Sequence, residues 1–113
     1  MTARSFGIAT IAPFAVLIIV GASRAWAADV DVDQQGIRFS QPSVTLKVGD
    51  TMHFHNHDDV THNIMVIDSD DEPEDQGLQK PGVVIHKQFT DAGTFQVRCA
   101  IHPKMKMTVT VEK

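Results

Sequence analysis

Three side chains that can bind a metal ion lie within seven residues near the C-terminal end of the sequence. They are the thiol of Cys99, the imidazole of His102 and the thioether of Met105. Thiolate and thioether ligands select copper over ions that prefer oxygen, and two His, one Cys and a weakly bound Met form the ligand set of a blue-copper electron-transfer site. Residues 99–105 therefore supply two of the three strong ligands of such a site, together with a candidate for the weak one.

The second imidazole should come from a distant part of the chain, because a three-dimensional metal site needs a ligand from a segment that faces the loop carrying the other ligands. His62 fits best, since it stands between the polar residues 55–61 and the apolar residues 64–67, where a loop is expected to turn into a strand. Spacing alone does not separate it from its neighbours. The other histidines upstream of residue 102 are His53, His55, His57 and His86.

Two longer segments resemble the cupredoxins, most closely those of the amicyanin and plastocyanin type. They are residues 47–63 (KVGDTMHFHNHDDVTHN) and residues 91–105 (DAGTFQVRCAIHPKM), in which the C-x2-H-P-x-M loop and the upstream His-Asn pair are the specific features. The resemblance implies one copper ion per chain, which changes between Cu(I) and Cu(II). By position in the motifs, its four ligands are His62, Cys99, His102 and Met105.

The resemblance also implies a supporting residue, and it shows where this chain departs from the family. In the family, an Asn that closes the strand before the His-bearing loop ties that loop to the ligand Cys, and here it corresponds to Asn56. Thr61 replaces a Pro, residues 100–101 are Ala-Ile in place of Thr-Pro, and Lys104 stands where an aromatic residue is usual. Hydrogen bonds around ligands tune a metal, so we expect these changes to affect the potential and the partner but not ligation.

The elements that position these residues are predicted to be β-strands. Residues 93–99 and 105–111 alternate apolar and polar side chains, so residues 99–105 are predicted to connect two strands. The acidic residues 68–76 are predicted to form a solvated loop or local disorder. The other predicted strands are residues 29–33, 37–40, 43–48, 51–56, 63–67 and 83–89. Seven or eight short strands predict an all-β sandwich, and the resemblance implies a Greek-key β-sandwich with copper at one end.

Residues 1–27 have the three parts of a secretory signal peptide, which are a basic residue, an apolar stretch and the A-x-A pattern at residues 25–27. Cleavage is predicted after this pattern. It would leave residues 28–113 as a single copper-binding domain that is exported to the periplasm and is not embedded in a membrane. An uncleaved membrane anchor is the alternative, but the apolar stretch is short for a membrane span and contains Pro13.

The composition of the remaining 86 residues narrows the classes of function. Loss of residues 1–27 removes two Arg and no acidic residue, so the formal charge moves from −4 to −6. An acidic domain argues against nucleic-acid binding, which needs a clustered basic face. Small domains often need a cross-link that adds stability, and the single Cys99 excludes an internal disulfide. A bound metal is the remaining local cross-link. We expect the domain to be a monomer.

Several candidate ligands also have a purely structural interpretation. Met105 and Met107 have the same strand parity, so only the loop spacing favours Met105, and Met107 is predicted to fill the core. His53 and His55 should share the outer face of a strand, and His86 should lie on the polar side of another. We predict that His53 and His55 are surface cover, with an accessory metal patch as the alternative, and that His86 is a solvated surface residue.

Two functions fit these residues, and enzymatic activity is not expected. A catalytic Cys/His nucleophile pair would need a third group to orient it. A c-type haem site needs two Cys before its His, and this chain has one Cys. A structural zinc site is disfavoured, because Met is a poor zinc ligand. The favoured function is a one-electron carrier between redox protein partners, because the four-ligand set is specific. The alternative is copper buffering, sequestration or tolerance, with His53, His55 and His57 as accessory ligands.

Overall fold

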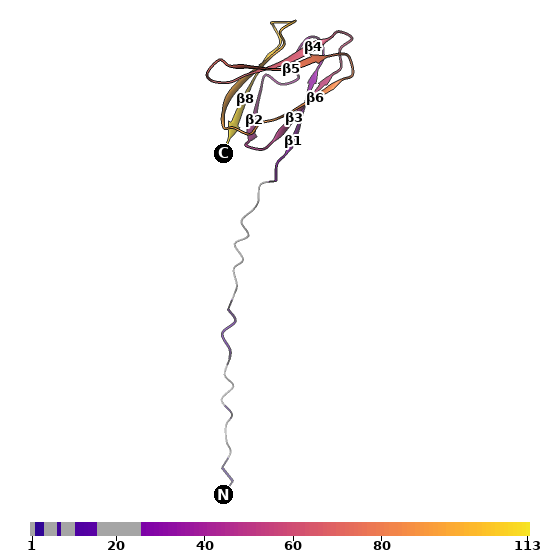
Figure 1. Ribbon diagram of the computed structural model, residues 1–113. Helices are drawn as coiled ribbons and strands as arrows, with labels where there is room; N and C mark the ends of the chain where they lie inside the picture. The colour runs from indigo at the N-terminus through magenta and orange to yellow at the C-terminus, as the bar shows by residue number, and fades with distance from the viewer. Residues whose placement is uncertain (1, 4–6, 8–10, 16–25) are drawn as a thin grey trace.

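The computed structural model describes residues 2–3, 7, 11–15 and 26–113 of the chain. Within this part the chain forms eight β-strands and no α-helix (Figure 1). The strands are β1 (Asp29–Gln34), β2 (Ser43–Lys47), β3 (Thr51–Asn56), β4 (His62–Ile67), β5 (Pro73–Gln79), β6 (Val84–Gln88), β7 (Gly93–Arg98) and β8 (Lys106–Glu112). The prediction of an all-β fold with seven or eight strands is confirmed.

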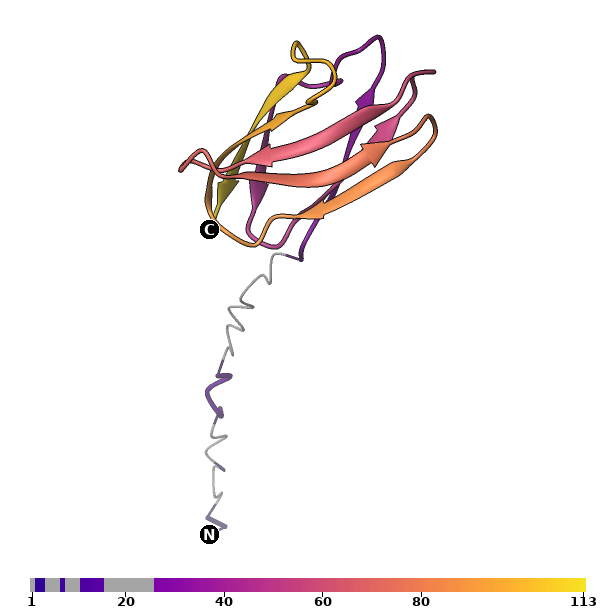
Figure 2. The same ribbon diagram turned by 45° about the horizontal axis from the view of Figure 1, so that its top comes forward.

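The strands form two sheets, one of three strands in the order β1-β3-β6 and one of five in the order β2-β8-β7-β4-β5. β1 pairs in parallel with β3, and β2 pairs in parallel with β8. Parallel neighbours cannot be joined by a hairpin, so the chain crosses between the sheets. The predicted Greek-key β-sandwich is thereby confirmed. Figure 2 shows that the connection between β7 and β8, coloured gold, lies at the end of the domain opposite the C-terminus.

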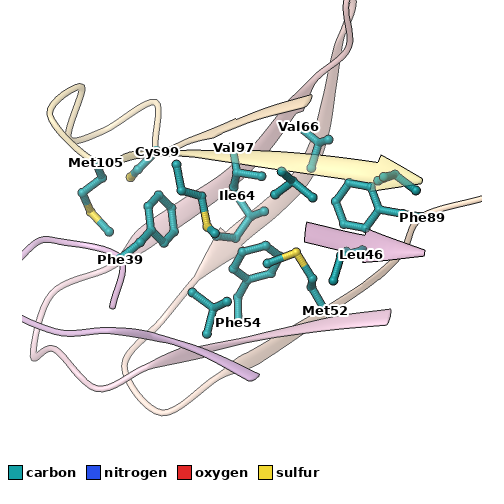
Figure 3. Close-up of a cluster of buried hydrophobic side chains, with 14 residues drawn as sticks. Phe39, Leu46, Met52, Phe54, Ile64, Val66, Phe89, Val97, Cys99 and Met105 are labelled. Carbon is teal, nitrogen blue, oxygen red and sulfur yellow. The ribbon is translucent and has the colours of Figure 1, made fainter. Parts of the chain in front are cut away.

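The hydrophobic core lies between the two sheets and follows from strand alternation. On β8, Met107, Val109 and Val111 are buried while their neighbours are more exposed, and on β3 Met52 and Phe54 are buried in the same way. Successive side chains of a strand point to opposite faces, so each strand contributes every second residue to the core. Figure 3 shows the core cluster to which these side chains belong, with Met52 and Phe54 inside it and Cys99 and Met105 at one edge.

The prediction that residues 68–76 form a loop is wrong for the second half of that segment. β5 begins at Pro73 and pairs antiparallel with β4 at the edge of the five-stranded sheet. Most of its side chains are exposed, because an edge strand is held by backbone hydrogen bonds and needs no apolar face. Charged side chains and a proline on such an edge are typical, since they discourage pairing with another chain.

The predicted strand at residues 37–40 is also wrong. This segment has only an isolated pairing of Gln34 with Phe39. Gly36 and Ile37 have φ angles of 65° and 57°, in the left-handed region that strands do not use. Their amides bind a carboxylate on another loop, which explains why the alternating pattern did not produce a strand here.

The predicted signal peptide at residues 1–27 falls largely outside the described residues. Among the residues that the structure does describe, no helix has the length and apolar character needed to cross a membrane.

Candidate metal centre

Three of the four predicted ligands converge at one end of the sandwich. His62 is the first residue of β4, Cys99 follows the last residue of β7, and His102 lies in the connection between β7 and β8. Their ligand atoms all lie within 4.8 Å of one another. His62 and Cys99 are almost completely buried, whereas His102 is half-buried. The histidine that spacing alone could not separate from its neighbours is therefore the one that reaches the Cys-bearing loop.

The two imidazole rings present the same nitrogen to the site. The Nδ1 atoms of His62 and His102 lie 3.2 Å apart, and the Sγ atom of Cys99 lies 3.7 Å from Nδ1 of His102. The rings are nearly perpendicular, with an interplanar angle of 75°. Two nitrogens and one sulfur thus point toward a common centre, as expected for residues that share one metal ion.

Met105 is buried next to Cys99, at the end of the same loop (Figure 3). The loop is closed by two backbone hydrogen bonds, in which Cys99 N donates to Met105 O over 3.2 Å and Met105 N donates to His102 O over 2.9 Å. Met107 is equally buried, but it lies on β8 opposite Val97 and belongs to the core. The structure thus places Met105 in the connection that carries the other candidate ligands, and Met107 within a strand.

Asn63, and not Asn56, connects the two ligand-bearing segments. The backbone amide of Asn63 donates to Cys99 Sγ over 3.3 Å, and its Oδ1 accepts a hydrogen bond from the amide of Ala100 at 3.1 Å. The prediction for Asn56 is wrong, because its Nδ2 donates to the carbonyls of Val60 and Gln79. Asn56 therefore stabilises the loop before His62 and does not link that loop to Cys99.

The side chain of Asn63 is itself held in place from the edge strand. Its Nδ2 donates to Asp75 Oδ1 over 2.7 Å and to the carbonyl of Gly77 over 3.1 Å. The pairing of β4 with β5 shifts register between Asn63 and Met65, and Gly77 has a φ angle of 100° that favours glycine. This irregularity turns the β5 backbone so that it can bind the amide. The strand that the sequence did not predict therefore helps to support the metal centre.

Asp58 contacts the candidate metal centre, which the sequence did not predict. Its Oδ2 lies 2.7 Å from Nε2 of His62, and it also accepts hydrogen bonds from the amides of Gly36 at 2.6 Å and Ile37 at 3.0 Å. Burial alone would raise the pKa of Asp58, but the hydrogen bond from His62 and the two amides together outweigh it and lower the pKa. The group is therefore a carboxylate at neutral pH.

This carboxylate fixes the tautomer of His62. A carboxylate can only accept hydrogen bonds, so Nε2 of His62 carries the proton and Nδ1 is left with a lone pair directed at the site. Carboxylate partners of this kind orient metal-binding histidines and raise their basicity. Nothing in the sequence distinguishes Asp58 from the adjacent Asp59, since only the fold shows which side chain reaches the ring.

The remaining histidines lie elsewhere, on the outer face of the three-stranded sheet. His53, His55 and His57 each place Nε2 within hydrogen-bond distance of an Asp on β1. The pairs are His53 with Asp29 at 2.8 Å, His55 with Asp31 at 2.8 Å and His57 with Asp33 at 2.9 Å. None of these three belongs to the group of converging ligand atoms.

Comparison with known proteins agrees with this geometry. The family model "Copper binding proteins, plastocyanin/azurin family" matches residues 26–112. The chain is 32% identical over 85 residues to the methylamine utilization protein MauL of Methylorubrum extorquens, covering 75% of each chain. It is 32% identical over 83 residues to amicyanin of Paracoccus denitrificans, covering 72% of this chain and 63% of that one.

Solved amicyanin structures share the fold. A Cu(I) form of one amicyanin variant superimposes with a TM-score of 0.68 and 27% identity, covering 74% of this chain and 82% of that one. A reduced form of another variant gives a TM-score of 0.68 and 29% identity, covering 80% and 88%. The residues present fit the ion that these relatives bind, because a thiol, two imidazoles and a thioether form a donor set that favours copper. The chain belongs to the plastocyanin/azurin family of copper-binding proteins, the cupredoxins, and its cofactor is one copper ion.

Proposed function

We propose that this protein is an exported type 1 copper protein that carries single electrons between two redox proteins. His62, Cys99 and His102 would bind the copper strongly, and Met105 would bind it weakly. The observation that carries this proposal is the convergence of two Nδ1 atoms and one Sγ within 4.8 Å. When bound in such a site, copper supplies a one-electron couple between Cu(I) and Cu(II).

The residues around the site are arranged to keep it rigid. His62 is held by Asp58, and the sulfur of Cys99 is held by the amide of Asn63. Both ligands are almost fully buried, so they cannot move freely when the charge of the site changes. A fixed ligand frame lowers the structural reorganisation that each electron transfer requires, which suits a carrier.

His102 is the proposed point of electron exit. It is half-buried, whereas His62 is inaccessible. Apolar side chains are exposed on three loops that meet at this end of the molecule, with Ile37 at 43%, Val60 at 36% and Ile101 at 48%. Asp58 connects the first two loops, because it binds the amide of Ile37 and the ring of His62. The ring of His62 in turn lies beside that of His102 in the third loop. An apolar surface around the exposed ligand suits brief docking to a redox partner.

Burial also argues against catalysis at this site. His62 is 0% exposed, and Cys99 and Met105 are each 1% exposed. A copper enzyme needs an open coordination position for its substrate, as catalytic metal sites in general do. With four side chains filling the site from within the protein, we infer electron transfer and no enzymatic activity.

The local structure supports cleavage of residues 1–27. β1 begins at Asp29, and the amide of Ala28 already donates to Asp50 Oδ1 over 2.8 Å. Cleavage before Ala28 would turn this amide into an ammonium group that faces the carboxylate, so the new terminus would stay docked. Such a product would be a monomeric periplasmic domain. N-terminal sequencing of the protein exported by a bacterial host tests the position, and a first residue other than Ala28 would contradict it.

The carrier function is tested by redox cycling of the copper-loaded protein. Reduction with ascorbate and oxidation with ferricyanide, followed by visible absorption, should transfer one electron per chain reversibly over many cycles. A copper-storage protein would instead release or exchange its ion during the cycles. Loss of copper on reduction would therefore contradict the carrier and favour copper handling.

A further inference from the structure

A second pair of imidazoles meets on the outer face of the three-stranded sheet. His53 on β3 and His86 on β6 are direct partners in the antiparallel pairing of these strands. Their Nδ1 atoms face each other in direct contact. The side chain of His53 is 21% exposed and His86 is exposed, so an ion could reach both nitrogens from solvent.

This pair has the same geometry as the two imidazoles of the copper centre. The ring centroids of His53 and His86 are 4.7 Å apart with an interplanar angle of 76°, and those of His62 and His102 are 5.0 Å apart with an angle of 75°. In both pairs the two Nδ1 atoms point at each other. His53 and His86 therefore present their Nδ1 atoms in the same arrangement as the two imidazoles of the copper centre.

A carboxylate also supports one ring in each pair. Asp29 Oδ1 lies 2.8 Å from Nε2 of His53, as Asp58 Oδ2 lies 2.7 Å from Nε2 of His62. With the proton of His53 held on Nε2 by this acceptor, its Nδ1 carries a free lone pair. A carboxylate, a histidine and a metal in this order form a common arrangement in metal sites.

We propose that His53 and His86 form a second metal site, which binds one divalent ion such as Cu(II) or Zn(II) through the two Nδ1 atoms. Imidazole ligands suit both ions, and Cu(II) binds most tightly among the divalent first-row metals. No thiol or thioether takes part, and water completes the coordination on the exposed strand face. The bound Cu(II) would therefore be tetragonal and would lack the intense thiolate absorption of the first site.

The neighbouring histidines provide a matched control. The rings of His55 and His57 are stacked, with an interplanar angle of 9° and centroids 6.0 Å apart, so their nitrogens do not converge on one point. Each has its Nε2 beside a carboxylate of β1, as His53 does. His57 is thus an exposed histidine on the same face that lacks an imidazole facing its Nδ1, and its replacement should leave the second site intact.

The experiment is a titration of the protein with Cu(II), after it has taken up one equivalent of copper, followed by electron paramagnetic resonance. We expect a second, tetragonal signal to appear with one further equivalent in the unmodified protein and in His57→Gln. The signal should be lost in His53→Gln and in His86→Gln. The thiolate absorption of the first site, recorded on the same samples, should be unchanged in all three variants.

Three results would overturn the proposal. They are the absence of a second signal in the unmodified protein, its persistence in His86→Gln, and its equal loss in His57→Gln. The first of these would mean that His53 and His86 share only a hydrogen bond. Because the two sites have no residue in common, failure of the first site to show thiolate absorption would be a separate result, which bears only on the proposed function.

Discussion

The backbone amide of Asn63 donates a hydrogen bond to the sulfur of Cys99 over 3.3 Å, although 36 positions separate the two residues. The side chain of Asn63 strengthens this link, because its Oδ1 accepts from the amide of Ala100. One residue thus joins the strand that carries His62 to the loop that carries the other candidate ligands. Its position directly after His62 makes the link part of the site itself.

Replacement of the Asn63 side chain should loosen this link. Asn63→Ala keeps the backbone hydrogen bond to Cys99 but leaves the Ala100 amide without its partner, which should cost about 1 to 3 kcal/mol of stability. We expect lower stability in urea and a broadened or shifted thiolate absorption. Asn56→Ala, which also removes buried hydrogen bonds, should lower stability without changing the absorption. Equal spectral changes in both variants would restore Asn56 as the linking residue.

Loss of the Asp58 carboxylate should weaken copper binding. Asp58→Asn removes the charge that faces Nε2 of His62, and changes of this kind typically lower metal affinity by about 10-fold to 100-fold. Competition with a chelator measures the difference. Asp59→Asn is the matched control, because Asp59 is exposed on the same loop. If both variants lost affinity equally, the general charge of the loop and not the contact to His62 would be responsible.

The two neighbouring buried methionines should behave differently. Met105→Leu should keep copper but change the reduction potential, because a thioether in such a site would bind the copper weakly and tune its potential. Met107→Leu is a volume-conserving change in the core, which usually costs less than about 1.5 kcal/mol, and it should leave the potential unchanged. Voltammetry on a protein electrode measures both. A shift produced only by Met107→Leu would show that the wrong sulfur had been chosen.

Asp50 should make folding stability depend on pH in the acid range. Hydrogen bonds from the amides of Ala28 and Lys47 lower its pKa below the usual value of 3.8. A carboxyl whose pKa falls on folding stabilises the fold when it is ionised. The contribution is present above pH 3.8 and is lost as the pH falls through the folded-state value.

Urea unfolding of Asp50→Asn across the acid range tests this dependence. The variant should be less stable than the unmodified protein at neutral pH, and the difference should shrink below pH 3.8. A difference that stays constant down to the lowest pH at which the protein folds would mean that the charge of Asp50 contributes nothing. The stability of Asp50→Asn would then reflect only altered hydrogen bonding.

Much of the fold could be predicted because its physical signals are local. Alternating side chains marked the strands that bury one face, such as β3 and β8. β5 was not predictable in this way, because it is held at the sheet edge by its backbone and buries little. The alternation at residues 37–40 misled, because the amides of Gly36 and Ile37 bind Asp58 and their left-handed backbone interrupts the strand.

The candidate ligands could be predicted because their residue types alone indicate a metal site. Cys99, His102 and Met105 are close in sequence and have few other reasons to occur together. The supporting contacts were not accessible, because Asn56 and Asn63 each follow a histidine, and only the folded chain shows which of them reaches the sulfur. A residue that supports a ligand from a distant part of the sequence is in general identified only once the fold shows the contact.

The central claim, that His62, Cys99, His102 and Met105 hold one copper ion, is tested most directly by titrating the metal-free protein with Cu(II) while recording visible absorption and electron paramagnetic resonance. The intense thiolate-to-copper absorption should rise linearly and saturate at one equivalent. In Cys99→Ala the apoprotein should remain folded and the absorption should be missing. An unmodified protein that binds Cu(II) without this absorption, or a Cys99→Ala variant that keeps it, would contradict the assignment.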